Sequence, residues 1–439
     1  MAFVHPLSCE CVKSELDLFS VPPTQTSIEC ASYVEYNPIS SLSDGTPIEF
    51  VINGSGQDYV DLANTQLYVK LNICHPNNAA IDGNSQVGPV NLLLHSLFSE
   101  VDIKLNDVLI SSTNNTYAYR SYLETLLSYG DDAKSTHLTS SLYYKDIAGK
   151  MDNANPLEAQ ANSGLKKRHS YFATGGTVDL LGRIHADIFY QPKYLPNDVT
   201  IRIRLVRNKN NFCLMSATPN ENYKVRISDC KIYVRKVKLS PSVFVAHAKA
   251  LETGNAKYPL RRVICKTFTV PRGNLDCTQE NLFSGQLPTR LVLGCVDNAA
   301  FNGDYGKNPF NFKHFSLSQL KVYLDGQQQN IRPLDLNFES NHYINAYMTL
   351  YTGTGKQFMD EGNQIQRDDF SRGYAIYAFD LTPDLAEDDH FNLIKDGNVR
   401  VDMKFAAALP NTMNVIVYAE FENIIEIDRS RNVIFDYTN

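Results

Sequence analysis

Alternation of apolar and polar residues is the dominant pattern of this chain. In EVDIKLND, residues 100–107, Val101, Ile103 and Leu105 alternate with charged or polar residues. Such alternation predicts a half-buried strand, and the Asn-Asp pair that follows predicts a turn before the next strand. Further strands are predicted at 47–52, 65–73, 176–184, 198–207, 230–239, 262–270, 289–296, 313–326, 374–381, 398–409 and 413–427.

Helical spacing is confined to short segments. Residues 122–129 place Tyr122, Leu123, Leu126 and Leu127 on one helical face, and HYINAYMTLY (342–351) is a second short helical or mixed segment. VNLLLHSLF (90–98) fits either a helical turn or a buried strand. Because strands dominate and both helical candidates are short, the pattern predicts an all-β protein.

The pattern of the first half returns in the second half. A shift of 219 residues pairs Val101 with Leu320, Ile103 with Val322 and Leu105 with Leu324. With small slippage, DVTIRIRLVR resembles NVRVDMKFAA, CKIYVRKVKL resembles MNVIVYAEFE, RSYLETLLSYG lies opposite NHYINAYMTLYTG, and Phe50 lies opposite Phe268. The period is far above the 20–50 residues of solenoid repeats, so it indicates a duplicated domain.

The duplication predicts two tandem eight-stranded jelly-roll β-sandwiches with short helices in their loops. The expected boundaries are an extended N-terminal arm at 1–44, a first jelly roll at 45–240, a linker at 241–259, a second jelly roll at 260–428 and a C-terminal tail at 429–439. Long polar segments at 75–89, 130–170, 207–223 and 297–313 are expected to be surface loops.

Composition narrows the possible partners. Hydrophobic residues make up 43% of the chain, enough for a core in each domain, and the net charge is −7. The densest basic site, Lys166-Lys167-Arg168, is expected to be a solvated loop. Direct or sequence-specific nucleic-acid binding is not expected, because such binding normally depends on clustered Lys and Arg.

The nine cysteines contain no C-x-x-C pair, which disfavours a zinc ribbon or a redox motif. We expect reduced, mostly buried thiols in a protein made in the cytosol. The N-terminus carries Glu10, Glu15 and Asp17 and has no long apolar core, so a signal peptide is not expected. A membrane span is not expected either, because no run of about 18 apolar residues occurs.

Tyr129-Gly130-Asp131-Asp132 has the spelling of a polymerase metal site. A polymerase would need these carboxylates on a strand hairpin that holds two metal ions. Here the motif follows a helix-like segment and precedes a polar region, so we interpret it as a helix end with a glycine cap.

Other motifs also fall short of an active site. His169, His185, His314 and His342 are scattered, without the H-x-H of a cupin metal site, and packing or loop roles are expected. EDDH at 387–390 is expected to be a solvated loop. TGTGK at 352–356 lacks residues of a phosphate-binding loop, and no G-x-S-x-G occurs. We therefore expect no catalytic residue, no cofactor site and no metal site, and the chain is predicted not to be an enzyme.

Three segments carry a resemblance to a known family. PIEFVINGSGQDYVDLANTQLYVKLNI, VNLLLHSLFSEVDIKLNDVLISSTNNTYAYRSYLETLLSYG and VRISDCKIYVRKVKLSPSV resemble the double jelly-roll major capsid proteins of Maverick/Polinton elements and adintoviruses. The match is close over most of the first half. In the second half it depends on the order and pattern of the elements.

The resemblance implies a viral major capsid protein that forms a homotrimer, a pseudo-hexagonal capsomer tiling an icosahedral shell around double-stranded DNA. It implies contacts with neighbouring capsomers and with penton or minor capsid proteins, and location in the virion after synthesis in the host cytosol and assembly in the cytoplasm or nucleus. The N-terminal arm would reach an inner protein or an inner membrane. The family has no catalytic residues to transfer to this chain.

The residues alone leave other roles open. A two-domain jelly-roll protein could instead bind a carbohydrate or a receptor, and an aromatic-lined pocket or a cation cluster in the outer loops would favour that role. Convergent His and carboxylate residues at one barrel mouth would favour a jelly-roll enzyme. A minor capsid or spike role is a further alternative, which two complete jelly rolls would disfavour.

Overall fold

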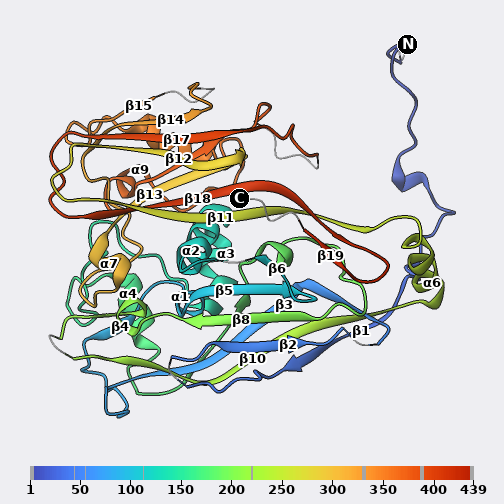
Figure 1. Ribbon diagram of the computed structural model, residues 1–439, viewed down its shortest axis with the longest axis horizontal. Helices are drawn as coiled ribbons and strands as arrows, with labels where there is room; N and C mark the ends of the chain where they lie inside the picture. Colours follow the sequence, from blue (N-terminus) through green and yellow to red (C-terminus); the bar gives the residue numbers. More distant parts are fainter. Residues whose placement is uncertain are drawn as a thin grey trace.

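The computed structural model describes residues 4–43, 45–54, 56–111, 113–218, 221–328, 333–385 and 390–435. Within these ranges the strands form two β-sandwiches, one above the other in Figure 1, each made of two antiparallel sheets. Short helices lie between the sandwiches and at their ends, and the N-terminal segment extends away from both (Figure 1).

The first sandwich combines two four-stranded sheets of described residues. One sheet has the order β1 (Ile28–Tyr36), β10 (Lys224–Leu239), β3 (Asp58–Cys74), β7 (Val178–Arg183). The other has the order β2 (Ile48–Ile52), β8 (Ile201–Arg207), β5 (Phe98–Leu105), β6 (Val108–Ser111). A small ladder of β4 (Val87–Pro89) and β9 (Leu214–Ser216) lies beside them.

The second sandwich repeats this plan. One sheet has the order β11 (Ala256–Val270), β18 (Met413–Ile427), β13 (Arg290–Asp297), β16 (Ile376–Asp380), and β19 (Val433–Ile434) pairs with β18. The other has the order β12 (Asp276–Gln286), β17 (Asp396–Phe405), β14 (Leu317–Leu324), β15 (Leu334–Asp335).

The helices are short, as the sequence predicts. They are α1 (Leu93–Ser96), α2 (Tyr117–Ser128), α3 (Asp131–Ser135), α4 (Ser163–Ser170), α5 (Asn210–Cys213), α6 (Pro241–Ala250), α7 (Asn298–Asn302), α8 (Ile344–Thr352) and α9 (Arg367–Phe370), with 3-10 turns η1 (Ser14–Leu16), η2 (His137–Ser141) and η3 (Asp187–Phe189). The ambiguous 90–98 segment contains both predicted states, because α1 is a single turn that leads directly into β5.

The duplication is confirmed strand by strand. Along the chain, β1, β2, β3, β5, β6, β7, β8 and β10 occupy the same places in their sheets as β11, β12, β13, β14, β15, β16, β17 and β18. The 219-residue shift aligns β5 with β14 and also aligns the turns that follow them. Asn106 and Asp107 have φ of 44° and 68°, and Asp325 and Gly326 have φ of 50° and 70°. Two consecutive positive φ values are typical of a tight type I′ hairpin turn.

One pairing from the repeat is wrong. Phe50 lies in β2, whereas Phe268 lies in β11, which is the counterpart of β1. The two phenylalanines therefore occupy different sheets of their sandwiches. Alternation is common to all strands, so a match of one aromatic residue does not identify which strand it belongs to.

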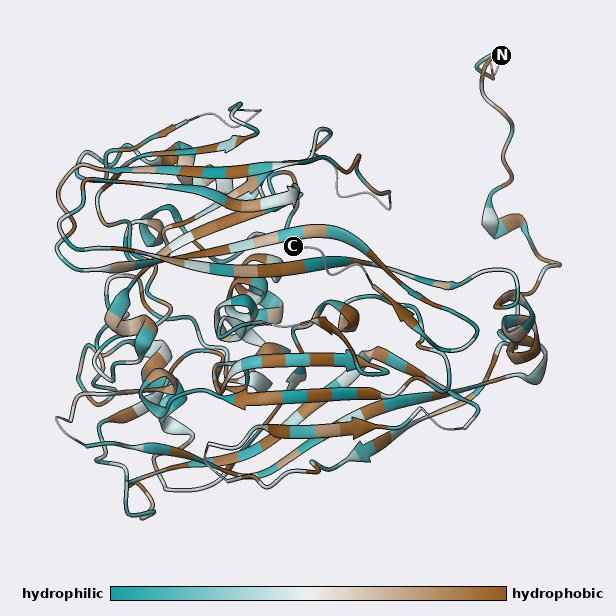
Figure 2. Ribbon diagram, in the orientation of Figure 1, coloured by the Kyte–Doolittle hydropathy of each residue, from teal (hydrophilic) through white to brown (hydrophobic). Residues whose placement is uncertain are grey.

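Burial along the strands explains the alternation. In β8, Ile201, Ile203 and Leu205 are buried, whereas Arg202 and Arg204 point to solvent. Hydrophilic and hydrophobic colours accordingly alternate along β5 and β8 in Figure 2. In β13, β16 and β18 nearly every residue is buried, so one face of that sheet packs inside its sandwich and the other face packs on something outside it.

The predicted segment boundaries differ from the structure in several places. The segment 1–44, expected to be an extended arm, contains the strand β1, which pairs with β10, so the part that extends away is 4–27. The expected linker at 241–259 contains α6 and the start of β11, and the tail at 429–439 contains β19. Of the expected surface loops, 130–170 contains α3, η2 and α4 and many buried residues, so it is not a solvated loop.

Candidate functional site: the junction of the two sandwiches

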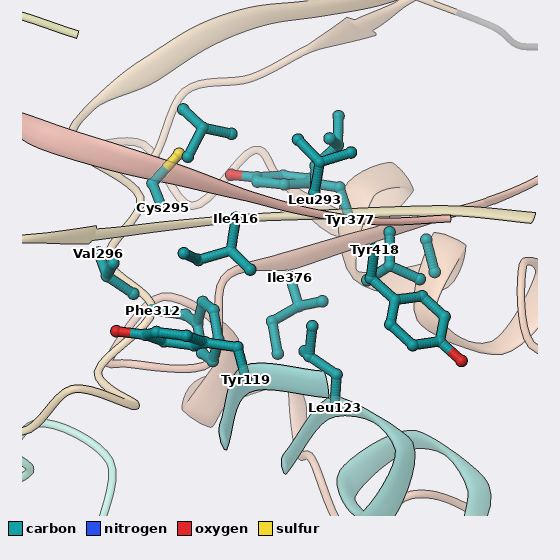
Figure 3. Packing of buried hydrophobic residues seen from close by; sticks show 14 of the residues in the cluster. Tyr119, Leu123, Leu293, Cys295, Val296, Phe312, Ile376, Tyr377, Ile416 and Tyr418 are labelled. Atoms are coloured by element: carbon teal, nitrogen blue, oxygen red, sulfur yellow. The ribbon is translucent and has the colours of Figure 1, made fainter. Parts of the chain in front are cut away.

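Helix α2 belongs to the first sandwich in sequence but packs on the second. Its residues Tyr119, Tyr122, Leu123 and Leu126 are part of the hydrophobic cluster built by the second sandwich. Figure 3 shows Tyr119 and Leu123 on the side of the sheet where Val296, Ile376 and Ile416 lie, while Leu293, Cys295 and Tyr377 lie on the other side. The helix therefore covers part of the outer face of the sheet β11-β18-β13-β16, which explains why β13, β16 and β18 are buried on both faces.

Aromatic rings fix the position of this helix. The ring of Tyr122 stacks on that of Phe310 at a centroid distance of 4.2 Å, and Tyr119 stacks on Phe301 at 5.7 Å. Phe312 packs against Gly294 of β13, where an added Cβ atom would lie 2.5 Å from the ring. The close approach of ring and strand therefore requires glycine at this position.

The second sandwich also contributes to the core of the first. Tyr258 and Leu260 of β11 and Ile425 and Ile427 of β18 are buried in the hydrophobic cluster of the first sandwich. Each sandwich thus supplies apolar side chains to its neighbour. Because burying apolar side chains is favourable, this exchange stabilises the contact between the two sandwiches.

A buried cluster of charges crosses the junction beside α2. Arg120 Nε donates to Glu124 at 2.9 Å, and its Nη2 donates to Asp187 at 2.6 Å. Asp187 Oδ1 also accepts the backbone N–H of Val263 on β11, at 3.1 Å. His185 Nδ1 lies 2.6 Å from Glu124 Oε2. The carboxylate of Asp187 therefore joins a helix of the first sandwich to the edge strand of the second.

Burial and pairing act in opposite directions on these carboxylates. Burial raises the pKa of Glu124, but Arg120 and His185 outweigh it and lower that pKa to about 2. At Asp187 burial has the larger effect and raises the pKa despite the adjacent Arg120. This difference between neighbours follows from the number of side-chain partners, because Glu124 bonds both Arg120 and His185, whereas the carboxylate of Asp187 bonds only one of these two side chains, Arg120.

A second buried ion pair lies at the other side of the junction. Arg168 Nη2 donates to Asp146 Oδ1 at 2.7 Å, and both side chains are fully buried. The other carboxylate oxygen of Asp146 accepts Asn308 Nδ2 at 3.0 Å, and Tyr374 of the second sandwich donates its hydroxyl to the Asp146 carbonyl at 2.7 Å. The expectation that the Lys166-Lys167-Arg168 site is a solvated loop is therefore wrong for Arg168. The run lies on α4, with only its two lysines exposed.

Lys134 forms a third link across the junction. Its ammonium group donates to the carbonyl oxygens of Leu126, at the end of α2, and Asn363, both at 2.7 Å. Burial lowers the pKa of Lys134 to about 7. Two carbonyl acceptors hold the group in place without any paired carboxylate.

The YGDD motif is not part of a metal site in the structure. The prediction that Gly130 caps the end of α2 as a left-handed residue is wrong. Gly130 has φ −84° and lies directly before α3, so it begins the next helix. Asp131 and Asp132 form the exposed first turn of α3, where carboxylates interact favourably with the helix dipole. Over the described ranges, no three His, Cys, Asp or Glu residues are arranged to hold a metal ion.

The scattered histidines have separate surroundings. His169 bonds the Val87 carbonyl at 2.7 Å, His185 belongs to the buried charge cluster, and His314 stacks on Phe338 at 4.0 Å. The backbone of His342 pairs with Asn337. Within the EDDH segment, residues 387–389 lie outside the described ranges. In the TGTGK segment, Lys356 donates to the Ser128 carbonyl at 2.8 Å, across the junction.

Two clefts open at the junction. One, of about 700 Å³, is lined from both sandwiches and includes Arg183, Tyr190, Arg261 and Glu422. The other, of about 690 Å³, is bordered by exposed carboxylates of the two sandwiches. Both have mixed charge and neither brings together a nucleophile, a base and an oxyanion-binding group.

The N-terminal segment and the thiols complete the description of the surface. Every described side chain before residue 28 is exposed or nearly so, including the apolar residues Leu7, Phe19 and Val21. Cys9, Cys11 and Cys30 are exposed, whereas burial raises the pKa of the Cys213 and Cys295 thiols to about 12. Among the described helices, none has the length and apolar character needed to cross a membrane.

The fold has close counterparts among solved viral structures. The chain aligns with a chain of the Sputnik virophage structure at a TM-score of 0.67 and 13% identity, covering 99% of this chain and 94% of that one. It aligns with the Faustovirus major capsid protein at 0.57 and 9% identity, covering 93% and 92%. The mavirus major capsid protein aligns at 0.53 and 12% identity, covering 99% and 95%. The chain has a double jelly-roll fold.

The sequence comparisons add one relative. An uncharacterised Caenorhabditis elegans protein, F54H12.2, is 27% identical over 428 residues, which cover 95% of this chain and 99% of that protein. No protein-family model matches the chain. The alignment spans both sandwiches of this chain and nearly the whole length of the relative.

Proposed function

We propose that this protein is a viral major capsid protein. In this role three copies form a pseudo-hexagonal, hexon-like capsomer, and capsomers tile an icosahedral shell that encloses double-stranded DNA. The observation that carries the proposal is the full-length double jelly roll, whose two sandwiches share one strand order and one fixed junction. The Faustovirus and mavirus proteins with which it aligns from end to end are major capsid proteins.

The physical character of the chain supports a building block. The charged residues of the junction bond one another and the backbone of both sandwiches, and so hold the two in one orientation. A shell subunit needs a fixed shape and defined edges more than it needs a reaction centre. We propose a structural, non-enzymatic role that uses no cofactor.

We further propose that the source is a Maverick/Polinton element or an adintovirus. The resemblance of the first-half segments supports this assignment. The nematode relative also supports it, because an element integrated in animal genomes would leave a protein of this length in such an organism.

The proposed partners follow from this role. They are two further copies of the chain, neighbouring capsomers, and penton or minor capsid proteins, all in the virion. The exposed segment before β1 is proposed to bind an inner protein or an inner membrane, because its apolar side chains are largely exposed in the single chain. DNA is proposed to be enclosed without sequence-specific contact, in keeping with the net charge of −7.

Light scattering on the purified full-length protein, followed by electron microscopy of the main species, tests the proposal. We expect a mass of three chains and hexagonal outlines, with shells under some conditions of salt and pH. Because interfaces within a capsomer are larger than those between capsomers, trimers should persist when shells dissociate. A monomer under all conditions, together with binding to a glycan array, would instead support a carbohydrate- or receptor-binding protein.

A further inference from the structure

The chain makes one sandwich-to-sandwich contact internally and leaves the two matching surfaces of that contact free. We infer that the face of α8 and its flanking segment 341–359 docks on the outer face of the sheet β1-β10-β3-β7 of a second copy. This contact would repeat between chains what α2 and the sheet β11-β18-β13-β16 do within one chain. The inference rests on the proposed function and assigns residues to the seam of the proposed trimer.

The first free surface is the sheet of the first sandwich. In the second sandwich, the strands β13, β16 and β18 of the equivalent sheet are buried on both faces because α2 covers their outside. In β10 only alternate residues are buried. Lys231, Tyr233 and Arg235 point outward and are only partly covered. At the edge of this sheet, Tyr33 of β1 is 56% exposed.

The second free surface is α8. In strand order, α8 lies between β15 and β16, as α2 lies between β6 and β7. Yet α2 has ten buried residues among its twelve, whereas α8 buries only Ala346 and Leu350 among its nine. Ile344 on the open face of α8 is 43% exposed, and Phe358 and Met359 just beyond the helix are 92% and 68% exposed.

The edge strands show the same asymmetry. The edge strand β11 is bonded at the junction, where Asp187 of the first sandwich accepts the Val263 N–H. Its counterpart β1 pairs only with β10 along its length and lies at the outer border of the molecule. An unpaired strand edge is a common place for another chain to bind.

Repetition of one contact gives a closed assembly. A head-to-tail contact between similar units forms a ring when the rotation closes. Each chain already contains two such units and one such contact. In the proposed trimer, the ring would alternate internal and external junctions, because three chains supply six units.

The chemistry of the two surfaces suits a contact between separately folded chains. Tyr68 and Tyr233 lie edge to face on the sheet at a centroid distance of 6.0 Å. They are flanked by the ion pairs Lys231–Glu35 at 2.7 Å and Arg235–Asp61 at 2.6 Å. Tyrosine with paired charges is soluble when exposed but offers large apolar rings to Ile344 and Phe358 of the partner.

Three matched variants of the full-length chain test the inference: Ile344→Arg on α8, Tyr233→Arg on the sheet, and the control Val245→Arg. Val245 is an apolar residue on the surface of α6, is 65% exposed, and belongs to neither α8 nor a strand of the sheet. By native mass spectrometry at equal concentration, we expect each of the first two to weaken trimer formation at least about tenfold, since a charge would be buried at the seam. The control should remain trimeric. Circular dichroism of each variant checks its folding.

Cross-linking of unmodified protein provides a second measurement that needs no variant. Isotopically light and heavy copies are mixed, assembled and treated with a lysine-reactive agent. We expect light-to-heavy links from Lys356, which follows α8 within the docking segment 341–359, to Lys70 or Lys231 on the sheet. Trimers that survive both variants and give inter-copy links elsewhere would overturn the inference but leave the capsid proposal intact. A wild-type protein that never forms oligomers would overturn the proposed function itself.

Discussion

Removing the guanidinium of Arg168 should destabilise the protein more than any change at the neighbouring lysines. Arg168→Met leaves the Asp146 carboxylate buried without its cation, which costs about 3–5 kcal/mol. Arg168 also donates to the carbonyl oxygens of Pro89 and Tyr144, at 2.8 and 2.6 Å. Each carbonyl left without a donor adds about 1–3 kcal/mol, so we expect a total loss of at least about 5 kcal/mol.

Thermal unfolding at a fixed scan rate measures this loss. At about 2–4 °C per kcal/mol for a domain of this size, Arg168→Met should lower the midpoint by about 10–20 °C. The control Lys166→Met changes an exposed side chain of the same helix and should have an effect within about 0.5 kcal/mol. Adding Asp146→Asn to Arg168→Met should recover part of the loss, because the buried charge is gone. A midpoint for Arg168→Met within about 2 °C of wild type would refute this reasoning.

Three further predictions concern pH, a turn and the thiols. Burial lowers the pKa of Lys134 from 10.5 to about 7, so between these pH values the unfolded chain binds a proton that the folded chain does not, and stability should rise as pH increases from about 7 toward 10.5. Unfolding midpoints across this window should rise less in Lys134→Met, and parallel profiles would contradict the assignment. Gly326→Val places a β-branched residue at φ 70° and should cost about 1–2 kcal/mol by urea titration, whereas Gly254→Val, in equally open space without a positive φ, is the control that should cost clearly less. Brief alkylation of the native protein followed by mass spectrometry should first label the exposed thiols of Cys9, Cys11 and Cys30. Early labelling of the buried Cys213 or Cys295 would show that the cores open readily.

The parts of the fold that depend on local pattern could be predicted from the sequence. Alternation identified β5 and β14 because each has one face in a core and one in water. The Asn106-Asp107 turn was predicted because these residue types tolerate positive φ. The duplication was detectable because the order of several elements repeats, even though individual residue matches are weak.

The parts that depend on distant partners could not be predicted in the same way. Arg168 looks like any surface cation until Asp146, Asn308 and Tyr374 are brought around it. The segment 130–170 is polar, and polarity normally indicates solvent, but here the polar groups bond one another between the sandwiches. A possible signal was the near-continuous apolar runs in β13 and β18, which indicate sheets covered on both faces.

The strand order also determines when each sandwich can close during synthesis. In each half, the last long strand, β10 or β18, lies between the strand made first and a third strand, so it completes the centre of its sheet. The β1 strand must therefore wait for a partner that emerges about 200 residues later, which at 5–20 residues per second is roughly 10–40 s. During this interval its edges are exposed on the ribosome, and a nascent chain released before its final strand cannot close the second sandwich. Ribosomal release of truncated chains would thus produce material for chaperones and proteases, and only a chain read through its last long strand can complete both sandwiches.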